Sequence, residues 1–525
     1  MSDVDPMLRY WGWFFLVIYI GAMLFFGYLG MRRVKNSDDF ATARNSYGPL
    51  FLAFALTATA ASGGTFLGIP ALGYKFGLPT MWYAVLYPAG TYVGLLICLR
   101  GIRRAGAQFG TRSIPEYLGD RFDSEVIRVL VALFSLLLMF YLAAQLLSGA
   151  VMFNKMMGLP LLWALIVTAI VVMVYILIGG AHADILTDGI QGALMLALSV
   201  AVVLMFVVGF GVDGGFDAAM ASLEAQDPML VARFHPDSVI VDGTWDAFAI
   251  FMMHVPLGLL PHVANKMWAL KSDRDQNLFI TLAFAFGMIL PLITFGGILA
   301  RAILGDSLMV EGASANDAIP ALFIATMPTW LAALIGAGVL SAIMSTADGL
   351  VVSSSQIFAN DIYRRSIAPR LENPPSDEQI DRTALIISRV ATIGVIGVSI
   401  WLAWLSQSMN VAILIAAGVG GMVSAIAGPI FLGILWRGST KTGALTGMLI
   451  GAGVFILVIT SKYFPDALFV DGETHPVLLW LRSQSNNPFA CGTLGIFASL
   501  IVTYVVSLFT EKPSADHLRK VFGTE

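Results

Sequence analysis

Long apolar runs recur along almost the whole chain, and most of them are long enough to cross a lipid bilayer. A transmembrane helix needs roughly 20 apolar residues, and in the bilayer core it must satisfy its own backbone hydrogen bonds. Hydrophobic residues make up 58% of the 525 residues and charged residues only 12%, with a mean hydropathy of +0.81. The sequence therefore predicts an all-α polytopic membrane protein.

The apolar runs predict about thirteen transmembrane helices, whose limits are set by where each run begins and ends. They cover residues 11–31, 50–74, 79–99, 127–154, 160–180, 185–211, 246–266, 277–304, 328–357, 384–405, 411–435, 442–461 and 488–509. The first run is too long for the apolar part of a signal peptide, so we interpret it as a retained helix.

Basic residues are distributed unevenly between the two sides of this arrangement. All of the 30 Lys and Arg follow odd-numbered spans, except Arg9, Lys75, Lys155, Arg233, Arg301, Lys462 and Arg482. Lys35 is counted after the first span, and Lys266 in the loop after the seventh. Because short cytoplasmic loops are enriched in Lys and Arg, we expect a multi-pass protein of the cell (inner) membrane, with its N-terminus outside and its C-terminus in the cytoplasm.

Two of the predicted spans contain residues that interrupt a helix. The second contains Gly63-Gly64 and then Pro70, and the seventh contains Pro256 and Pro261. Non-helical backbone survives at membrane depth only where it is buried in protein or lines a cavity, and there it can hold ions or anionic groups. A close contact between helices rich in small residues is the alternative for the first break alone. Because the breaks are five spans apart, we predict a 5+5 inverted repeat with a discontinuous second and seventh span.

This repeat divides the chain into five predicted parts. They are an N-terminal extra helix with a cytoplasmic loop (1–49), a first repeat (50–211), an extracellular loop (212–245), a second repeat (246–435), and two C-terminal helices with a cytoplasmic tail (436–525). No loop contains a GxxxxGK[ST] phosphate-binding motif, and the six His and two Cys lack the spacing of a zinc site. The sequence therefore indicates no enzyme, no nucleic-acid partner and no obligate protein partner.

The ninth span carries oxygen-bearing side chains at membrane depth. Ser345 and Thr346 are adjacent, and Asp348 lies within one turn of both. Such oxygens suit a hard cation such as sodium, although hydroxyls in membrane helices also bond back to their own helix carbonyls. An intramembrane carboxylate is costly and is by default a functional candidate. Asp188 is the second such carboxylate. The alternative to a functional role is that it stabilises the N-terminus of its helix, but Asp184 suits that structural role better.

Several stretches resemble the sodium:solute symporter family. They are Leu340-Ser341-Ala342-Ile343-Met344-Ser345-Thr346 with Asp361-Ile362-Tyr363, Leu186-Thr187-Asp188-Gly189-Ile190-Gln191, and Ala427-Gly428-Pro429 with Trp436-Arg437. Phe66-Leu67-Gly68-Ile69-Pro70 and Leu260-Pro261-His262 are most similar to its pantothenate and monocarboxylate members. The resemblance covers about residues 10–460 and implies a LeuT-type fold that works by alternating access.

The resemblance also implies a sodium site. Its ligands would be the carbonyls of Ala58, Ala61 and Ala342 and the hydroxyls of Ser345 and Thr346. Asp188 matches a family aspartate that is linked to sodium affinity. In members with a second sodium this aspartate joins Ser345 and two further hydroxyls, but here the two positions are Asp348 and Gly349. We therefore expect Asp188 and Asp348 to share either a second cation or a proton.

The substrate site is expected between the two breaks. Its candidate residues are Ser62, Gly63, Gly64 and Thr65 at the first break, Tyr87 by family position, and His254 at the second break. Backbone amides freed around the glycines would favour a carboxylate, and no Lys or Arg is expected deep in the core. A packed, hydrogen-bonded side chain is the alternative for His254.

These observations predict a secondary active transporter that couples sodium to the uptake of a small organic solute. The expected solute is a carboxylate, pantothenate-like or monocarboxylate-like, and the expected partners are sodium, this small-molecule substrate and the lipid bilayer. A proline-like amino acid or a sugar is the alternative solute. A channel and a transporter-like sensor are the alternative classes.

Overall fold

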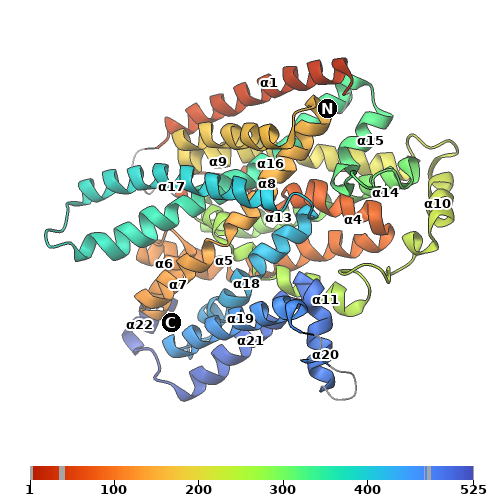
Figure 1. The fold of residues 1–525 in the computed structure, drawn as a ribbon. Helices are drawn as coiled ribbons and strands as arrows, with labels where there is room; N and C mark the ends of the chain where they lie inside the picture. The colour runs from red at the N-terminus through yellow and green to blue at the C-terminus, as the bar shows by residue number, and fades with distance from the viewer. Residues whose placement is uncertain (1–3, 35–41, 466–467, 470–474, 524–525) are drawn as a thin grey trace.

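The computed structural model of the chain is a bundle of helices, and it describes residues 4–34, 42–465, 468–469 and 475–523 (Figure 1). Within these ranges all regular structure is helical, apart from one isolated bridge between Tyr47 and Leu270. Lys35, which was counted with the cytoplasmic basic residues, lies outside the described residues. The predicted all-α class is confirmed.

Most of the chain lies in long helices. Apart from the two broken spans, they are α1 (Pro6–Met31), α5 (Met81–Phe109), α7 (Glu125–Ser135) with α8 (Leu138–Met157), α9 (Leu161–Val208), α13 (Gln276–Ile289) with α14 (Thr294–Leu304), α16 (Thr329–Gln356) with η9 (Ile357–Ile367), α17 (Asp377–Leu405), α18 (Val411–Leu435), α19 (Lys441–Thr460) and α21 (Pro488–Phe509). Short helices outside the spans are α6 (Ile114–Phe122), α10 (Gly215–Gln226), α15 (Ala318–Thr326), α20 (Pro476–Ser483) and α22 (Ala515–Phe522).

Among the residues that the structure describes, ten helices are long and apolar enough to cross a membrane, and two sharply bent pairs bring the number to twelve. The remaining expected span, residues 160–180, corresponds to the first half of α9. Gly180 has φ 54° and ψ −147°, so α9 is two helices that meet at a kink. Glycine takes such a backbone conformation at little cost. The apolar helix described there, Leu161–Met173, is shorter than the other ten, so the thirteenth span stays a prediction.

The first broken span consists of α3 (Pro49–Ala60), η1 (Gly64–Gly68) and α4 (Ile69–Phe76), with a bend of 61°. The helix stops because Ala61 adopts an extended conformation, with φ −91° and ψ 99°. The chain resumes at Gly64 as a π-helix, in which the Ile69 N–H bonds to the Gly64 carbonyl. Pro70 follows this wide turn, where its ring and missing N–H are tolerated.

The second broken span consists of α11 (Thr244–His254), η4 (Leu257–Leu259), α12 (Pro261–Ala264) and η5 (Asn265–Ala269), with a bend of 53°. Two prolines, Pro256 and Pro261, lie on either side of η4. Each proline removes one backbone donor, so the α-helical ladder cannot continue across this region. Both predicted breaks are therefore present, in the second and seventh expected spans.

Helix α16 occupies the centre of the bundle. Helices α8 and α9 pack along it, together with α3 and with α1, which also covers α9 at the edge of the molecule (Figure 1). Helix α18 packs on α8 and on α19 and α21, and these last two lie at the opposite edge (Figure 1). The C-terminus lies at the end where α6, α7 and α22 gather, whereas α10 and α15 lie at the other end (Figure 1). The 212–245 loop contains the short helix α10.

Cysteine labelling tests the predicted orientation. Ala225→Cys in α10 and Glu372→Cys before α17 introduce reporters at exposed positions, in a background in which the buried Cys98 and Cys491 are replaced by alanine. A membrane-impermeant maleimide applied to intact cells is expected to label residue 225 and to reach residue 372 only after permeabilisation, because the basic loops lie inside. The reverse pattern would contradict the orientation.

Candidate functional site

The end of α3 meets the middle of α16 through two hydroxyl–carbonyl hydrogen bonds. The Ser345 hydroxyl donates to the Ala58 carbonyl (2.8 Å) and to the Ala342 carbonyl (3.1 Å). The Thr346 hydroxyl donates to the Thr59 carbonyl (2.9 Å). Both hydroxyl-bearing side chains are completely buried. The last carbonyls of a helix lack intrahelical partners, so the break in α3 makes these oxygens available to α16.

This arrangement brings together four of the five residues expected at a sodium site. Ala58, Ala342, Ser345 and Thr346 belong to one hydrogen-bonded cluster. Ala61 lies just past the end of α3, where its N–H bonds to the Thr57 carbonyl (2.8 Å). The cluster lies at the negative end of the α3 dipole, which favours a cation. A cation held by both a hydroxyl and a carbonyl would require the hydroxyl proton to turn away from the carbonyl.

Asp188 lies beside this cluster and is bonded from two directions. The Thr59 hydroxyl donates to its Oδ2 atom (2.6 Å), and the Lys266 ammonium donates to the same atom (2.7 Å). Lys266 also donates to Asp184 Oδ2 (2.5 Å). Asp188 is 0% exposed and Lys266 is 2% exposed. A buried carboxylate of this kind needs a cationic partner, because its desolvation costs several kcal/mol.

The buried Lys266 corrects two of the sequence predictions. It was counted in a loop after the seventh span, and no Lys or Arg was expected deep in the core. The 53° bend after η4 turns η5 back against α9, so that Lys266 faces Asp184 and Asp188 instead of solvent. The span was predicted to be discontinuous, but its predicted limit at residue 266 placed Lys266 at its edge, because the direction of the bend cannot be read from the prolines.

Asp348 and Gly349 occupy the next turn of α16. Asp348 is completely buried. A Cβ atom at Gly349 would lie 3.3 Å from the His262 Cβ and from the Thr59 Cγ2, so this glycine lets α16 approach α3 and α12 closely. The absence of a hydroxyl at position 349 thus has a packing reason. The shared cation or proton expected between Asp188 and Asp348 stays a prediction, to which the structure adds Lys266 as a further partner of Asp188.

A small cavity lies between the two breaks. Five of the six expected substrate residues line it, namely Ser62, Gly64, Thr65, Tyr87 and His254, together with Ala60, Ile69, Tyr83, Tyr141, Leu257, Ala412 and Ile415. Its volume is about 30 Å³. One water needs roughly 10–15 Å³ on this measure, so the cavity accommodates a few waters and must widen to admit an organic solute.

The amides at the first break are not free, contrary to the sequence prediction. The Gly63 N–H donates to the Gln145 side-chain carbonyl (2.8 Å), and the Gly64 N–H donates to the Ser62 hydroxyl (3.1 Å). An unsatisfied buried amide costs about 1–3 kcal/mol, which these two hydrogen bonds avoid. An anion would have to displace Ser62 or Gln145 to reach them.

Hydroxyls and aromatic rings form the rest of the lining. The hydroxyls of Thr65 and Tyr87 are hydrogen-bonded to each other (2.8 Å). His254 Nδ1 lies 2.6 Å from the Ile250 carbonyl, and the ring stacks on Phe489 of α21 with centroids 5.5 Å apart. It also contacts Tyr87, at a centroid distance of 5.3 Å. His254 is therefore a packed, hydrogen-bonded wall of the cavity, which was the alternative noted for it.

A model of the sodium:solute symporter family matches residues 40–451. The chain belongs to the sodium:solute symporter family. It is a sodium-coupled solute symporter, a multi-pass membrane protein and a transporter rather than an enzyme.

Individual relatives agree with this assignment. The chain is 25% identical over 516 residues to sodium/proline symporter 2 of Staphylococcus saprophyticus, covering 95% of this chain and 93% of the relative. It is 27% identical over 449 residues to the sodium/pantothenate symporter of Haemophilus influenzae, covering 84% and 89%. The solved structure of a Na⁺-coupled sialic acid symporter superposes with a TM-score of 0.72 at 20% identity, covering 96% and 99%. The predicted LeuT-type fold is thereby confirmed.

Several residues of the symporter's cavity were not predicted from the sequence. Tyr83, Tyr141, Ala412 and Ile415 of α5, α8 and α18 are among them. Gln145 of α8, which bonds to the Gly63 N–H beside the cavity, was not predicted either. A helix that is apolar on every side gives no periodic signal for which face turns inward. Gln145 is the exception, since a lone amide within the apolar run 138–153 already indicates a buried polar contact.

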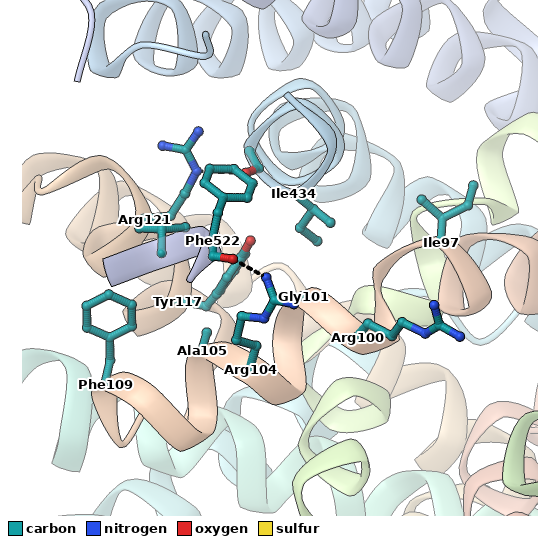
Figure 2. A pocket seen from close by; sticks show the side chains of 12 residues that line it. Ile97, Arg100, Gly101, Arg104, Ala105, Phe109, Tyr117, Arg121, Ile434 and Phe522 are labelled. Carbon is teal, nitrogen blue, oxygen red and sulfur yellow. Dashed lines mark hydrogen bonds between the residues drawn. The ribbon is translucent and has the colours of Figure 1, made fainter. Parts of the chain in front are cut away.

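The symporter has another cavity, which is lined by other residues. Figure 2 shows it between α5, α6, α18 and α22, with the side chains of Arg100, Arg104 and Arg121 around it. Its volume is about 180 Å³. The Arg104 guanidinium donates to the Phe522 carbonyl (2.5 Å), which ties the C-terminal helix to α5. None of the residues that line this cavity belongs to either broken span.

Close packing of η1 against α18 provides a test of the site. A Cβ atom at Gly68 would lie 2.5 Å from the Ala412 backbone nitrogen and 2.8 Å from the Ala412 Cβ. Gly68→Ala is therefore expected to push η1 away from α18 and to abolish sodium-driven uptake, with the protein still present in the membrane. Gly397→Ala, where nothing lies within 4 Å, is the matched control and should transport normally. Normal uptake by Gly68→Ala would show that this contact does not matter.

Proposed function

We propose that this symporter couples the inward movement of sodium to the uptake of a small carboxylate across the cell (inner) membrane. The coarse activity follows from the family. The choice of solute is supported by the names of relatives, since both proline and pantothenate carry a carboxylate. It is also supported by a cavity that combines hydroxyls and bonded backbone amides with apolar walls.

In this proposal, sodium binds where α3 ends against α16. Its ligands are the carbonyls of Ala58, Ala61 and Ala342 and the hydroxyls of Ser345 and Thr346. The observation that carries this assignment is the pair of short bonds from α16 hydroxyls to the last carbonyls of α3. Oxygen atoms already gathered at a helix C-terminus require little rearrangement to bind a cation.

The solute binds in the cavity next to the sodium site. Its carboxylate accepts hydrogen bonds from the Gly63 and Gly64 amides and from the hydroxyls of Thr65 and Tyr87. These bonds replace those that the two amides make to Gln145 and Ser62. Its apolar part packs on Leu257 and Ile415. Because α3 supplies the sodium carbonyls and the same break supplies the amides, sodium and solute stabilise one conformation of this segment together. Reciprocal stabilisation of this kind is what couples two binding events thermodynamically.

Alternating access follows from the size of the cavity. A volume of about 30 Å³ holds no organic solute, so both loading and release require the walls to move. The Asn410 amide at the start of α18 donates to the Gly68 carbonyl (3.0 Å), and α18 thereby closes over η1. Opening on this side breaks that bond and separates Gly68 from Ala412.

Uptake into proteoliposomes tests the solute class. Labelled pantothenate, acetate, proline and glucose are offered with an inward sodium gradient and with choline in its place. We expect at least one of the carboxylates to accumulate only with sodium, and glucose not to accumulate. The amide of the transported solute is the control competitor; it should compete poorly, because a neutral amide gains less from backbone N–H groups than a carboxylate does. Uptake of glucose alone would contradict the proposal.

Substitution of the α16 hydroxyls tests the sodium site. Ser345→Ala and Thr346→Ala each remove one oxygen, and a hydrogen-bond-strength contact to a charge is worth about 1.5–3 kcal/mol. The sodium concentration for half-maximal uptake is therefore expected to rise roughly ten- to a hundredfold in each. Thr346→Ser keeps the hydroxyl and should stay near wild type. Ser353→Ala, which removes a buried hydroxyl bonded to its own helix, is the matched control. Unchanged sodium dependence in the double mutant would remove these residues from the site.

A further inference from the structure

Lys266 and two aspartates form a charged cluster inside the membrane-spanning bundle. The Lys266 ammonium lies 2.5 Å from Asp184 Oδ2 and 2.7 Å from Asp188 Oδ2. The three residues are between 0% and 7% exposed. Two carboxylates and one ammonium leave one negative charge in excess, at a depth where an uncompensated charge is costly.

The excess negative charge lies close to the end of α3. Asp184 Oδ1 and Asp188 Oδ1 are buried and have no hydrogen-bond partner among the described residues. Asp188 is linked by the Thr59 hydroxyl (2.6 Å) to the last turn of α3. The Thr59 carbonyl and the neighbouring Ala58 carbonyl are the two groups that accept from Thr346 and Ser345. A single residue, Thr59, therefore connects the charged cluster to the proposed sodium ligands.

We propose that Lys266 is a resident cation that neutralises one of the two carboxylates permanently and leaves the other for a single transported sodium. The proposal rests on the sodium site given under the proposed function. Lys266 thus sets the number of sodium ions at one, because its ammonium supplies the charge that a second ion would otherwise bring. It is a positioning residue that acts on sodium through Asp188 and Thr59.

This inference differs from a purely structural role for Lys266. An ion pair that only pins η5 to α9 would change stability when broken, but it would leave the shape of the sodium dependence unaltered. A charge-balancing role instead makes the number of bound sodium ions follow the net charge of Lys266, Asp184 and Asp188. Variants of graded charge separate the two roles.

The test measures the sodium dependence of uptake by proteoliposomes, and of ²²Na⁺ binding to the purified protein. Wild type should give a hyperbolic curve in both. Lys266→Met leaves two excess negative charges and should give a sigmoidal curve, with additional bound sodium. Lys266→Met combined with Asp184→Asn restores the wild-type net charge and should return the curve to hyperbolic. Lys266→Arg keeps the charge and should stay hyperbolic.

Asp184→Asn alone removes the excess negative charge and keeps Lys266. Its sodium curve should stay hyperbolic, with half-maximal binding shifted at least about tenfold to higher sodium. This variant also serves if Lys266→Met does not fold. Lys271→Met removes an exposed lysine of the same segment and should leave both curves unchanged.

Two outcomes overturn the inference. One is a hyperbolic Lys266→Met curve with wild-type affinity; the other is an Asp184→Asn protein with unshifted sodium binding. Either result leaves the proposed function intact if the wild type still needs sodium. Wild-type uptake or binding that does not respond to sodium would instead refute the proposed sodium site itself.

Discussion

The contact between the end of α3 and the middle of α16 is the interaction on which the rest of the site depends. A membrane helix that stops inside the bilayer exposes carbonyls that lipid cannot satisfy. Here the hydroxyls of Ser345 and Thr346 satisfy them, and they do so from a helix buried at the centre of the bundle. The same break turns the chain at Gly63 and forms one wall of the cavity. Ion and solute chemistry are therefore joined by a few residues of one interrupted helix.

Charge balance is the second constraint. The cluster of Lys266, Asp184 and Asp188 lies where an unpaired charge is expensive, and its excess charge borders the α3 carbonyls. A cation that binds at the α3 carbonyls is stabilised electrostatically by that negative charge. When the cation leaves, the charge remains buried without a counter-ion. This supplies a physical reason for the bundle to rearrange when sodium leaves, since the empty site is the less stable one in a closed conformation.

The sequence predicts the fold class, both breaks and the oxygen-bearing pair Ser345 and Thr346, because each depends on local chemistry. Ala58 and Ala342 were implied only by the resemblance to the family. Apolar length predicts spans, Gly63-Gly64 and Pro261 predict interruptions, and adjacent hydroxyls predict an oxygen cluster. What it misses depends on tertiary geometry. From the sequence Lys266 is predicted to lie in a loop, because the inward bend of this segment has no sequence signal. The amides of the first break are predicted to be free, because the contact with Gln145 of α8 is not local in sequence. Tyr83 and Tyr141 lie on helices without a polar face, so their inward orientation leaves no trace in the pattern.

The ratio of sodium to solute transported is the most direct measure of this account. It can be obtained in proteoliposomes from the opposing solute gradient that just stops net flux at a fixed sodium gradient and a clamped membrane potential. One sodium ion at the α3–α16 contact, with Lys266 as the resident cation beside it, predicts that the balancing solute gradient equals the driving force on one sodium per solute. A ratio of two sodium ions per solute would contradict the account.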